Sequence, residues 1–94
     1  MYLHDIYDVI NDINKQLEDE SNNIYNLIIQ VKTLIKTVET LDLTKSERVY
    51  LNTLDSILDS IMTMDISGCR LKIVKTLLSV ILLYIVSLCD NNDM

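Results

Sequence analysis

The side chains able to do chemistry are few, and the first pair lies near the amino terminus. His4 is the only histidine and stands beside Asp5, a pair that could act as a general base if a nucleophile were brought against it. Both cysteines, Cys69 and Cys89, lie far along the chain, in or near an apolar stretch. We therefore expect His4 to be a solvent-exposed imidazole and not a catalytic base.

Three acids near the amino terminus are spaced to share one side of a helix. Asp5, Asp8 and Asp12 are separated by three and four residues, and carboxylate oxygens attract divalent cations. Di-metal helical bundles instead point carboxylates and histidines inward from several helices, whereas the inward positions here are apolar. With no glycine-rich phosphate loop, no CxxC pair and no HExxH motif, we predict no metal, no cofactor and no enzyme activity.

The cysteines and the first ten residues predict where the chain resides. Two thiols without a disulfide framework are typical of a reducing compartment. On one continuous helix, Cys69 and Cys89 would lie about 30 Å apart, too far to bridge. Residues 1–10 lack a basic segment followed by a long apolar core, so no secretory signal is predicted. We expect a cytoplasmic protein, in the host cytoplasm if the chain is viral.

Composition and charge favour one helical domain spanning residues 1–94. The chain has no proline and one glycine, Gly68, while 49% of its residues are hydrophobic, so a small core is attainable and turn residues are scarce. The formal net charge is −6, and residues 1–20 contribute −5 of it, as six acids against one base. Because an acidic chain repels the phosphate backbone, we expect no nucleic-acid binding.

Four segments carry apolar residues at helical spacing, separated by short polar joints. In the first, Leu3, Ile6, Ile10, Ile13 and Leu17 recur at intervals of three and four, which places them on one stripe of a helix. The joints are short, so successive helices must lie antiparallel. The predicted fold is all-α, a compact antiparallel four-helix bundle with short loops. We predict helices over about residues 2–19, 23–41, 45–63 and 68–89, followed by a polar tail at 90–94.

The third helix has the clearest local start signal. Thr44-Lys45-Ser46-Glu47 matches a capping box, in which the threonine hydroxyl and the glutamate carboxylate each satisfy an unpaired backbone N–H. A stripe of seven apolar residues follows, and we expect it to be buried. Its members are Tyr50, Leu51, Leu54, Ile57, Leu58, Ile61 and Met62.

The fourth segment is apolar on every side. Thr76–Cys89 contains no charge, and three neighbouring helices cannot cover a whole circumference. It could be a central helix of a monomer, a surface shared in a homodimer, or a membrane segment. A span of about 21 Å is short against a hydrocarbon core of about 30 Å, and Lys72 and Lys75 precede it. We favour a homodimer through this helix, with interaction residues Leu78, Ile81, Leu82, Tyr84, Ile85 and Leu88.

The absence of chemical motifs and the surplus of apolar surface together favour binding over catalysis. We predict a small intracellular regulatory or inhibitory module that binds another protein. Abundant Ile, Asn, Asp and Lys without Pro, Phe or Trp is typical of an AT-rich viral, phage or low-GC bacterial genome. In size and helix count the chain resembles the cytosolic immunity proteins of bacteriocin producers, which implies toxin immunity as an alternative, although those proteins are often basic. An adaptor anchored to a membrane by its C-terminal apolar helix is a further alternative.

Overall fold

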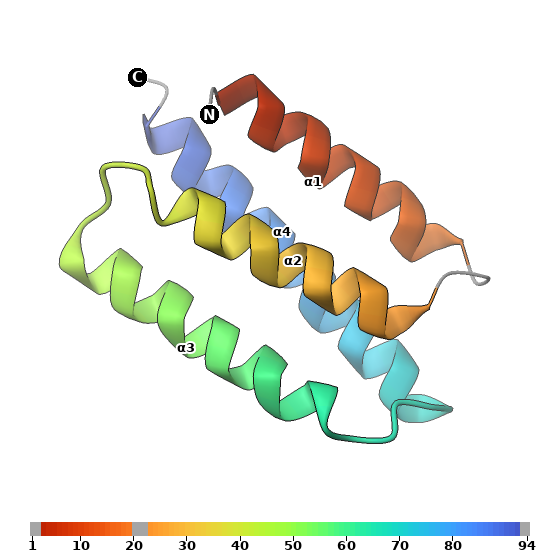
Figure 1. Ribbon diagram of the computed structural model, residues 1–94. Helices are drawn as coiled ribbons and strands as arrows, with labels where there is room; N and C mark the ends of the chain where they lie inside the picture. The colour runs from red at the N-terminus through yellow and green to blue at the C-terminus, as the bar shows by residue number, and fades with distance from the viewer. Residues whose placement is uncertain (1–2, 20–22, 93–94) are drawn as a thin grey trace.

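The computed structural model describes residues 3–19 and 23–92, and it confirms the predicted all-α four-helix bundle. The helices are α1 (Leu3–Glu18), α2 (Ile24–Val38), α3 (Lys45–Met62) and α4 (Cys69–Asn92), as Figure 1 shows. Each begins within one residue of its predicted start. Residue 2, the middle of the first joint and the last two residues of the predicted polar tail lie outside the described residues.

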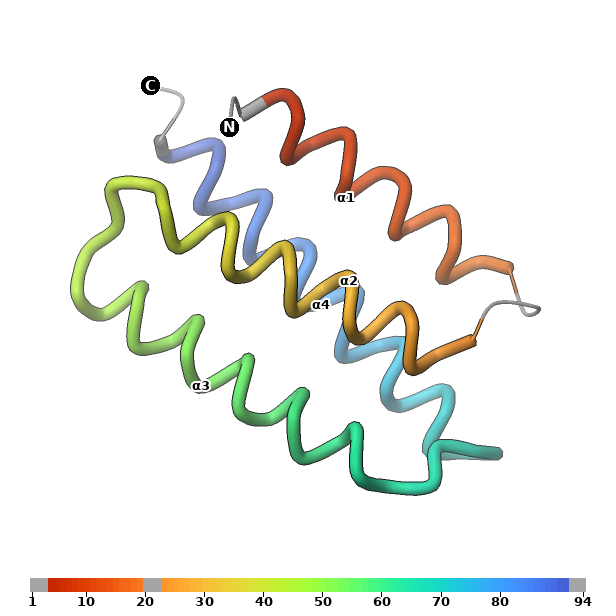
Figure 2. The backbone as a smooth tube through the Cα atoms, viewed as in Figure 1, coloured from red at the N-terminus to blue at the C-terminus, as the bar shows by residue number. Residues whose placement is uncertain are grey.

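The helices alternate in direction along the chain, and α2 is the central one (Figure 2). It packs against α1, α3 and α4, while α4 lies behind it in Figure 1 and also packs against α1. By contrast, α3 and α4 approach each other less closely than the other consecutive helices. The start of α1 and the end of α4 lie at the same end of the bundle, where the Tyr7 hydroxyl donates a hydrogen bond to an Asp90 carboxylate oxygen.

The core is formed by the predicted stripes of α1 and α2 and by one side each of α3 and α4. In α1, Ile6, Ile10, Ile13 and Leu17 are buried as expected. No polar side chain is buried among the described residues. The cluster thus depends on apolar packing, which stabilises a bundle by roughly 25 cal/mol for each Å² removed from water.

The prediction for α3 was wrong at two of its seven apolar positions. Leu51, Leu54 and Leu58 are buried, but Tyr50 and Ile57 are exposed. The reason is that α3 packs closely only against α2, so its side nearest α4 is left partly uncovered. Ile61 and Met62 are only partly buried.

Local hydrogen bonds fix the ends of the helices. The predicted capping box is present: the Thr44 hydroxyl accepts from the Glu47 backbone N–H at 3.2 Å, and the Glu47 carboxylate accepts from the Thr44 N–H at 2.8 Å. Between α3 and α4, Gly68 has φ +56°, a left-handed conformation that favours glycine. The Tyr25 hydroxyl of α2 forms hydrogen bonds with the backbone of this loop.

Two helix ends differ from the prediction. α2 stops at Val38, short of residue 41, because the chain turns there and Arg48 donates to the carbonyl oxygens of Glu39 at 2.6 Å and Leu41 at 2.8 Å. α4 continues to Asn92 where a polar tail was expected from residue 90. The contact of Asp90 with α1 holds this last turn against the bundle.

Candidate protein-interaction surface

Five of the six predicted interaction residues lie in the core of the single chain. Leu78, Ile81, Leu82, Ile85 and Leu88 are at most 2% exposed, because this side of α4 faces the other helices. They hold α4 in the bundle and offer no surface to a second molecule. The sixth residue, Tyr84, is half-buried at the margin of the core.

A different set of residues lies on the outward side of α4. Ile73, Val80 and Leu83 are 67%, 56% and 69% exposed, and Thr76 and Ser87 are exposed between and beyond them. These five positions follow one another at intervals of four and three residues. That spacing repeats every seven residues and is typical of a seam at which one helix packs against another.

The exposed apolar surface continues from α4 onto α3. At one end, the rings of Tyr50 and Tyr84 have centroids 4.7 Å apart and are tilted by 51°. At the other end, Met64 and Ile73 line a hollow of about 240 Å³ between the two helices, which follows from their wider separation. We call this surface the α3–α4 face. It consists of Tyr50, Ile57, Ile61, Met64, Ile73, Leu77, Val80, Leu83 and Tyr84.

Charged residues stand near both ends of this face. Glu47 stands near Tyr84 at one end, and Arg70 lines the hollow at the other. Burial, followed by the nearby Glu47 carboxylate, raises the pKa of Tyr84 above its ordinary value. The Tyr84 hydroxyl therefore stays protonated at neutral pH and remains a hydrogen-bond donor on a face without charged side chains.

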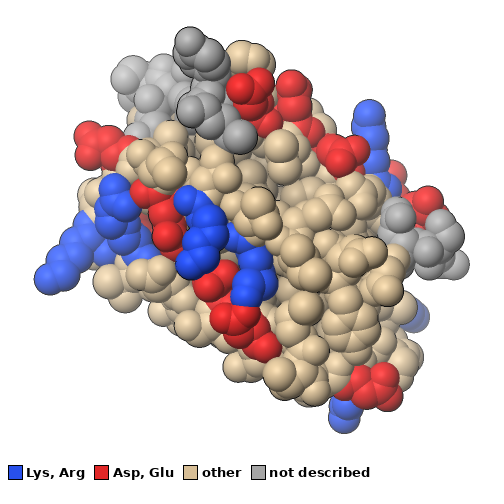
Figure 3. Space-filling view, in the orientation of Figure 1, with Lys and Arg blue, Asp and Glu red and all other residues tan. Residues whose placement is uncertain are grey.

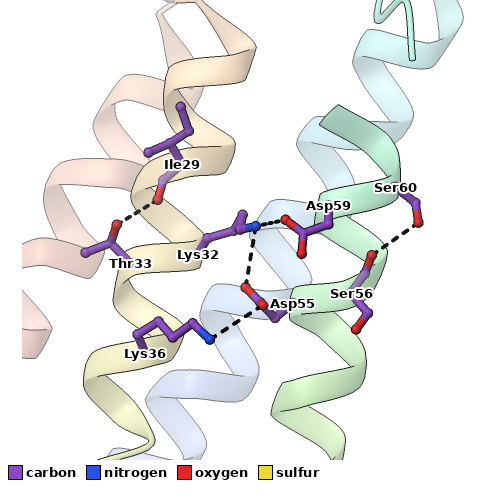
Figure 4. A network of polar contacts seen from close by, with 8 residues as sticks. All are labelled: Ile29, Lys32, Thr33, Lys36, Asp55, Ser56, Asp59 and Ser60. Carbon is purple, nitrogen blue, oxygen red and sulfur yellow. Dashed lines mark hydrogen bonds and ion pairs between the residues drawn. The ribbon is translucent and has the colours of Figure 1, made fainter. Parts of the chain in front are cut away.

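The opposite side of α3 is charged and is already paired with α2. Figure 4 shows Lys32 and Lys36 of α2 reaching toward Asp55 and Asp59 of α3. Lys32 forms an ion pair with Asp59, and the two lysine Nζ atoms lie 3.9 and 3.8 Å from the Asp55 carboxylate oxygens. Figure 3 shows basic and acidic side chains grouped side by side on the face that it presents. The two lysines and two aspartates thus balance one another's charge, although Asp55 Oδ1 is buried without a hydrogen bond from any described residue.

The residues first considered for chemistry lie on the surface of α1. His4 Nε2 lies 3.1 Å from an Asp5 carboxylate oxygen; the His4 side chain is largely exposed and the Asp5 side chain about half exposed. Asp8 and Asp12 are also exposed, and among the described residues no three His, Cys, Asp or Glu side chains gather as a metal site would require. The acids of α1 are a solvated surface.

The two cysteines occupy different environments on α4. Cys69 is exposed at the first turn, whereas Cys89 is buried in the last turns, and both are free thiols. Burial, with the neighbouring Asp90 carboxylate, raises the pKa of Cys89 above its ordinary value. Cys89 is therefore an inert core residue near neutral pH.

By length and composition alone, α4 could cross a membrane. The candidate span is Cys69–Asn91, 23 residues, or about 35 Å, and it includes charged residues on both sides of the uncharged Thr76–Cys89. One third of its most apolar part is buried inside the bundle. The core helix of a soluble bundle meets the same criterion, so this feature is weak evidence of a membrane segment.

Comparison with known proteins identifies no relative: no family model, no curated protein and no solved structure matches the chain. The likeness to bacteriocin immunity proteins remains one of size and helix count. The function is therefore inferred from the chain's own residues, above all from the α3–α4 face.

Proposed function

We propose that this chain is a small regulatory or inhibitory module that binds another polypeptide through the α3–α4 face and carries out no catalysis. The observation that carries this proposal is the outward row of Ile73, Val80 and Leu83, which is exposed although these residues belong to an apolar helix. An intracellular location agrees with two unpaired thiols.

The size of the exposed surface supports an interface. Six apolar side chains of the face are 41–69% exposed, and at roughly 100 Å² each they amount to on the order of 600 Å². That is the upper end of the apolar patches found on soluble monomers, and patches of this size are often binding sites. Tyrosine, methionine and aliphatic residues without charge are also what the centre of a protein interface contains.

The lining of the hollow supports binding over catalysis. The hollow between α3 and α4 is lined by Ile61, Met64, Ile66, Ile73 and Leu77 with Arg70 and Val74. Catalysis needs several polar groups that converge on a substrate, and here a single guanidinium stands at the rim. Its Nη1 donates to the Asp65 carbonyl oxygen at 3.2 Å. Apolar packing against a partner uses the whole surface.

The proposal is tested by affinity capture from lysate of the source cell with three immobilised baits. They are the wild-type chain, Leu83→Glu, and Ile29→Glu as a matched control, because Ile29 is an exposed isoleucine on α2 outside the face. A polypeptide, including this chain itself, should be retained by wild type and Ile29→Glu and lost with Leu83→Glu. Equal retention by all three baits, or by none, would contradict a role for the face.

A membrane-anchored adaptor is a second candidate, favoured by the length and apolarity of α4. In that case α4 would leave the bundle, and Leu78 and Ile85 would exchange their helix neighbours for lipid. Flotation of the purified chain with phospholipid vesicles distinguishes the two. Our proposal expects the chain to stay in the dense fraction, whereas flotation that survives high salt would favour the anchor.

A further inference from the structure

We propose that the molecule held at the α3–α4 face is a second copy of this chain, packed so that the two α4 helices run antiparallel about a two-fold axis near Val80. This inference rests on the proposed function, and it names the partner. It differs from a homodimer through the residues first predicted, because the contact uses the outward side of α4 and leaves the core unchanged.

The spacing of residues along α4 suits an antiparallel copy of itself. With the axis near Val80, Leu83 of one copy lies at the height of Leu77 and beside Thr76 of the other, and Ile73 lies at the height of Ser87. Large side chains thus oppose smaller ones on the outward row, which lets two helices approach and interdigitate. The two-fold axis makes every such contact twice.

The same axis also suits α3. Because Tyr50 lies against Tyr84 and the two helices run in opposite directions, the height of Val80 on α4 corresponds to Leu54 on α3. Tyr50 and Ile57 then lie four residues before and three residues after this point. An antiparallel copy of α3 would place Tyr50 of one chain against Ile57 of the other, and both are exposed in the single chain.

The area is what a stable dimer requires. An exposed apolar surface on the order of 600 Å² per copy gives about 1,200 Å² buried between two copies, which reaches the size of specific protein interfaces. A symmetric contact doubles the patch without requiring a complementary surface on another protein. Self-association of this acidic chain is also favoured because the face itself carries no charge. Two copies therefore bring no like charges into contact there.

The charges at the two ends of α4 select the antiparallel arrangement. Lys72 stands in the first turns and Asp90 in the last, both exposed and eighteen residues apart, which is five helical turns and places them on the same flank. An antiparallel copy brings Lys72 of one chain to within about 3 Å of the height of Asp90 of the other. A parallel copy would leave Lys72 of each chain about five turns from Asp90 of the other, and it would also align the two helix dipoles.

The test is sedimentation equilibrium of the full chain across a wide range of concentrations. Wild type and the control Ile29→Glu should sediment at twice the chain mass of 10.9 kDa, and Leu83→Glu should sediment at the chain mass with unchanged helix content by circular dichroism. A second set of variants tests the arrangement. Lys72→Glu and Asp90→Lys should each weaken the dimer severalfold, because the two-fold axis makes each exposed ion pair twice, and the double variant should restore it. Tyr7→Phe is the control for the Tyr7–Asp90 hydrogen bond that Asp90→Lys also removes.

Each outcome decides the inference. A wild-type chain that is monomeric throughout would overturn it, and a dimer unaffected by Leu83→Glu would overturn it as well. A dimer that the double charge variant fails to restore would overturn the antiparallel arrangement. Solubility only in detergent would favour the membrane anchor. If the chain is monomeric but Leu83→Glu still abolishes capture of a different protein, the proposed function stands and only the second copy is refuted.

Discussion

Truncation to alanine should change the free energy of unfolding by very different amounts at two leucines of α4 that are five residues apart. Leu78 is fully buried and Leu83 is 69% exposed. Leu78→Ala should lower the free energy of unfolding by about 3–4 kcal/mol, because it removes buried methyl groups and leaves a cavity. Leu83→Ala should change it by less than about 0.5 kcal/mol in the monomer.

The size of the first effect makes it easy to detect. A chain of 94 residues has a total stability on the order of 5–10 kcal/mol, so Leu78→Ala removes a third or more of it. Urea unfolding followed by far-UV circular dichroism measures both variants. The series is repeated over about a hundredfold range of protein concentration. If Leu83 contacts a second copy, Leu83→Ala should lose the dimer's contribution to the free energy of unfolding, and this loss grows with concentration.

One result would refute the reasoning. If Leu83→Ala were the more destabilising variant at the lowest concentration, and Leu78→Ala were nearly neutral, α4 would be rotated about its axis. The core would then contain the outward row, and the six residues first predicted would form the interface after all.

Four further predictions concern the loops and the thiols. Tyr25→Phe should cost about 1–2 kcal/mol in urea unfolding, because the Tyr25 hydroxyl donates to the Met64 carbonyl oxygen at 2.7 Å and accepts from a backbone N–H of the same loop at 3.2 Å; no change would mean that the loop is not held there. Thr44→Ala should cost about 1 kcal/mol by the same measurement, since it removes the capping box, and a neutral variant would contradict the cap. Cys69 should react with an aromatic disulfide reagent at once and Cys89 only on unfolding. Because the raised pKa keeps the Cys89 thiol protonated to higher pH in the folded chain, the free energy of unfolding should fall as pH rises above roughly 8.5, and Cys89→Ala should reduce that fall.

The helices with one apolar stripe could be predicted from the sequence. The spacing of the apolar residues indicates a helix, and the stripe shows which side of that helix faces the core. The stripe of α1 and the start of α3 at Thr44 are of this kind. Apolar side chains surround α4 between Thr76 and Cys89, so an apolar stripe does not reveal its direction. The available signal was polar: Lys72, Thr76, Ser87 and Asp90 share one side of the helix, and all are exposed. Five of the six predicted interaction residues lie on the core side of α4, and the exposed Ile73, Val80 and Leu83 were not among them.

Other features depend on contacts between distant residues. The last turn of α4 persists because Asp90 meets Tyr7 of α1, a contact 83 residues apart in sequence that local propensity does not encode. Tyr50 and Ile57 are exposed because α3 lies close to α2 and farther from α4. A signal was nonetheless present: Asp55 and Asp59 mark one side of α3 as polar, which leaves Tyr50 and Ile57 on the side toward α4.

The claim that the α3–α4 face is an interface between two copies is tested most directly by isotope-filtered nuclear Overhauser spectroscopy on an equal mixture of labelled and unlabelled chains. We predict intermolecular contacts from the Leu83 methyl groups to Thr76 and Leu77, and from the Ile57 methyl groups to the Tyr50 ring. Intermolecular contacts that come instead from Ile29 on the opposite side, or the absence of any such contact at millimolar concentration, would contradict the account.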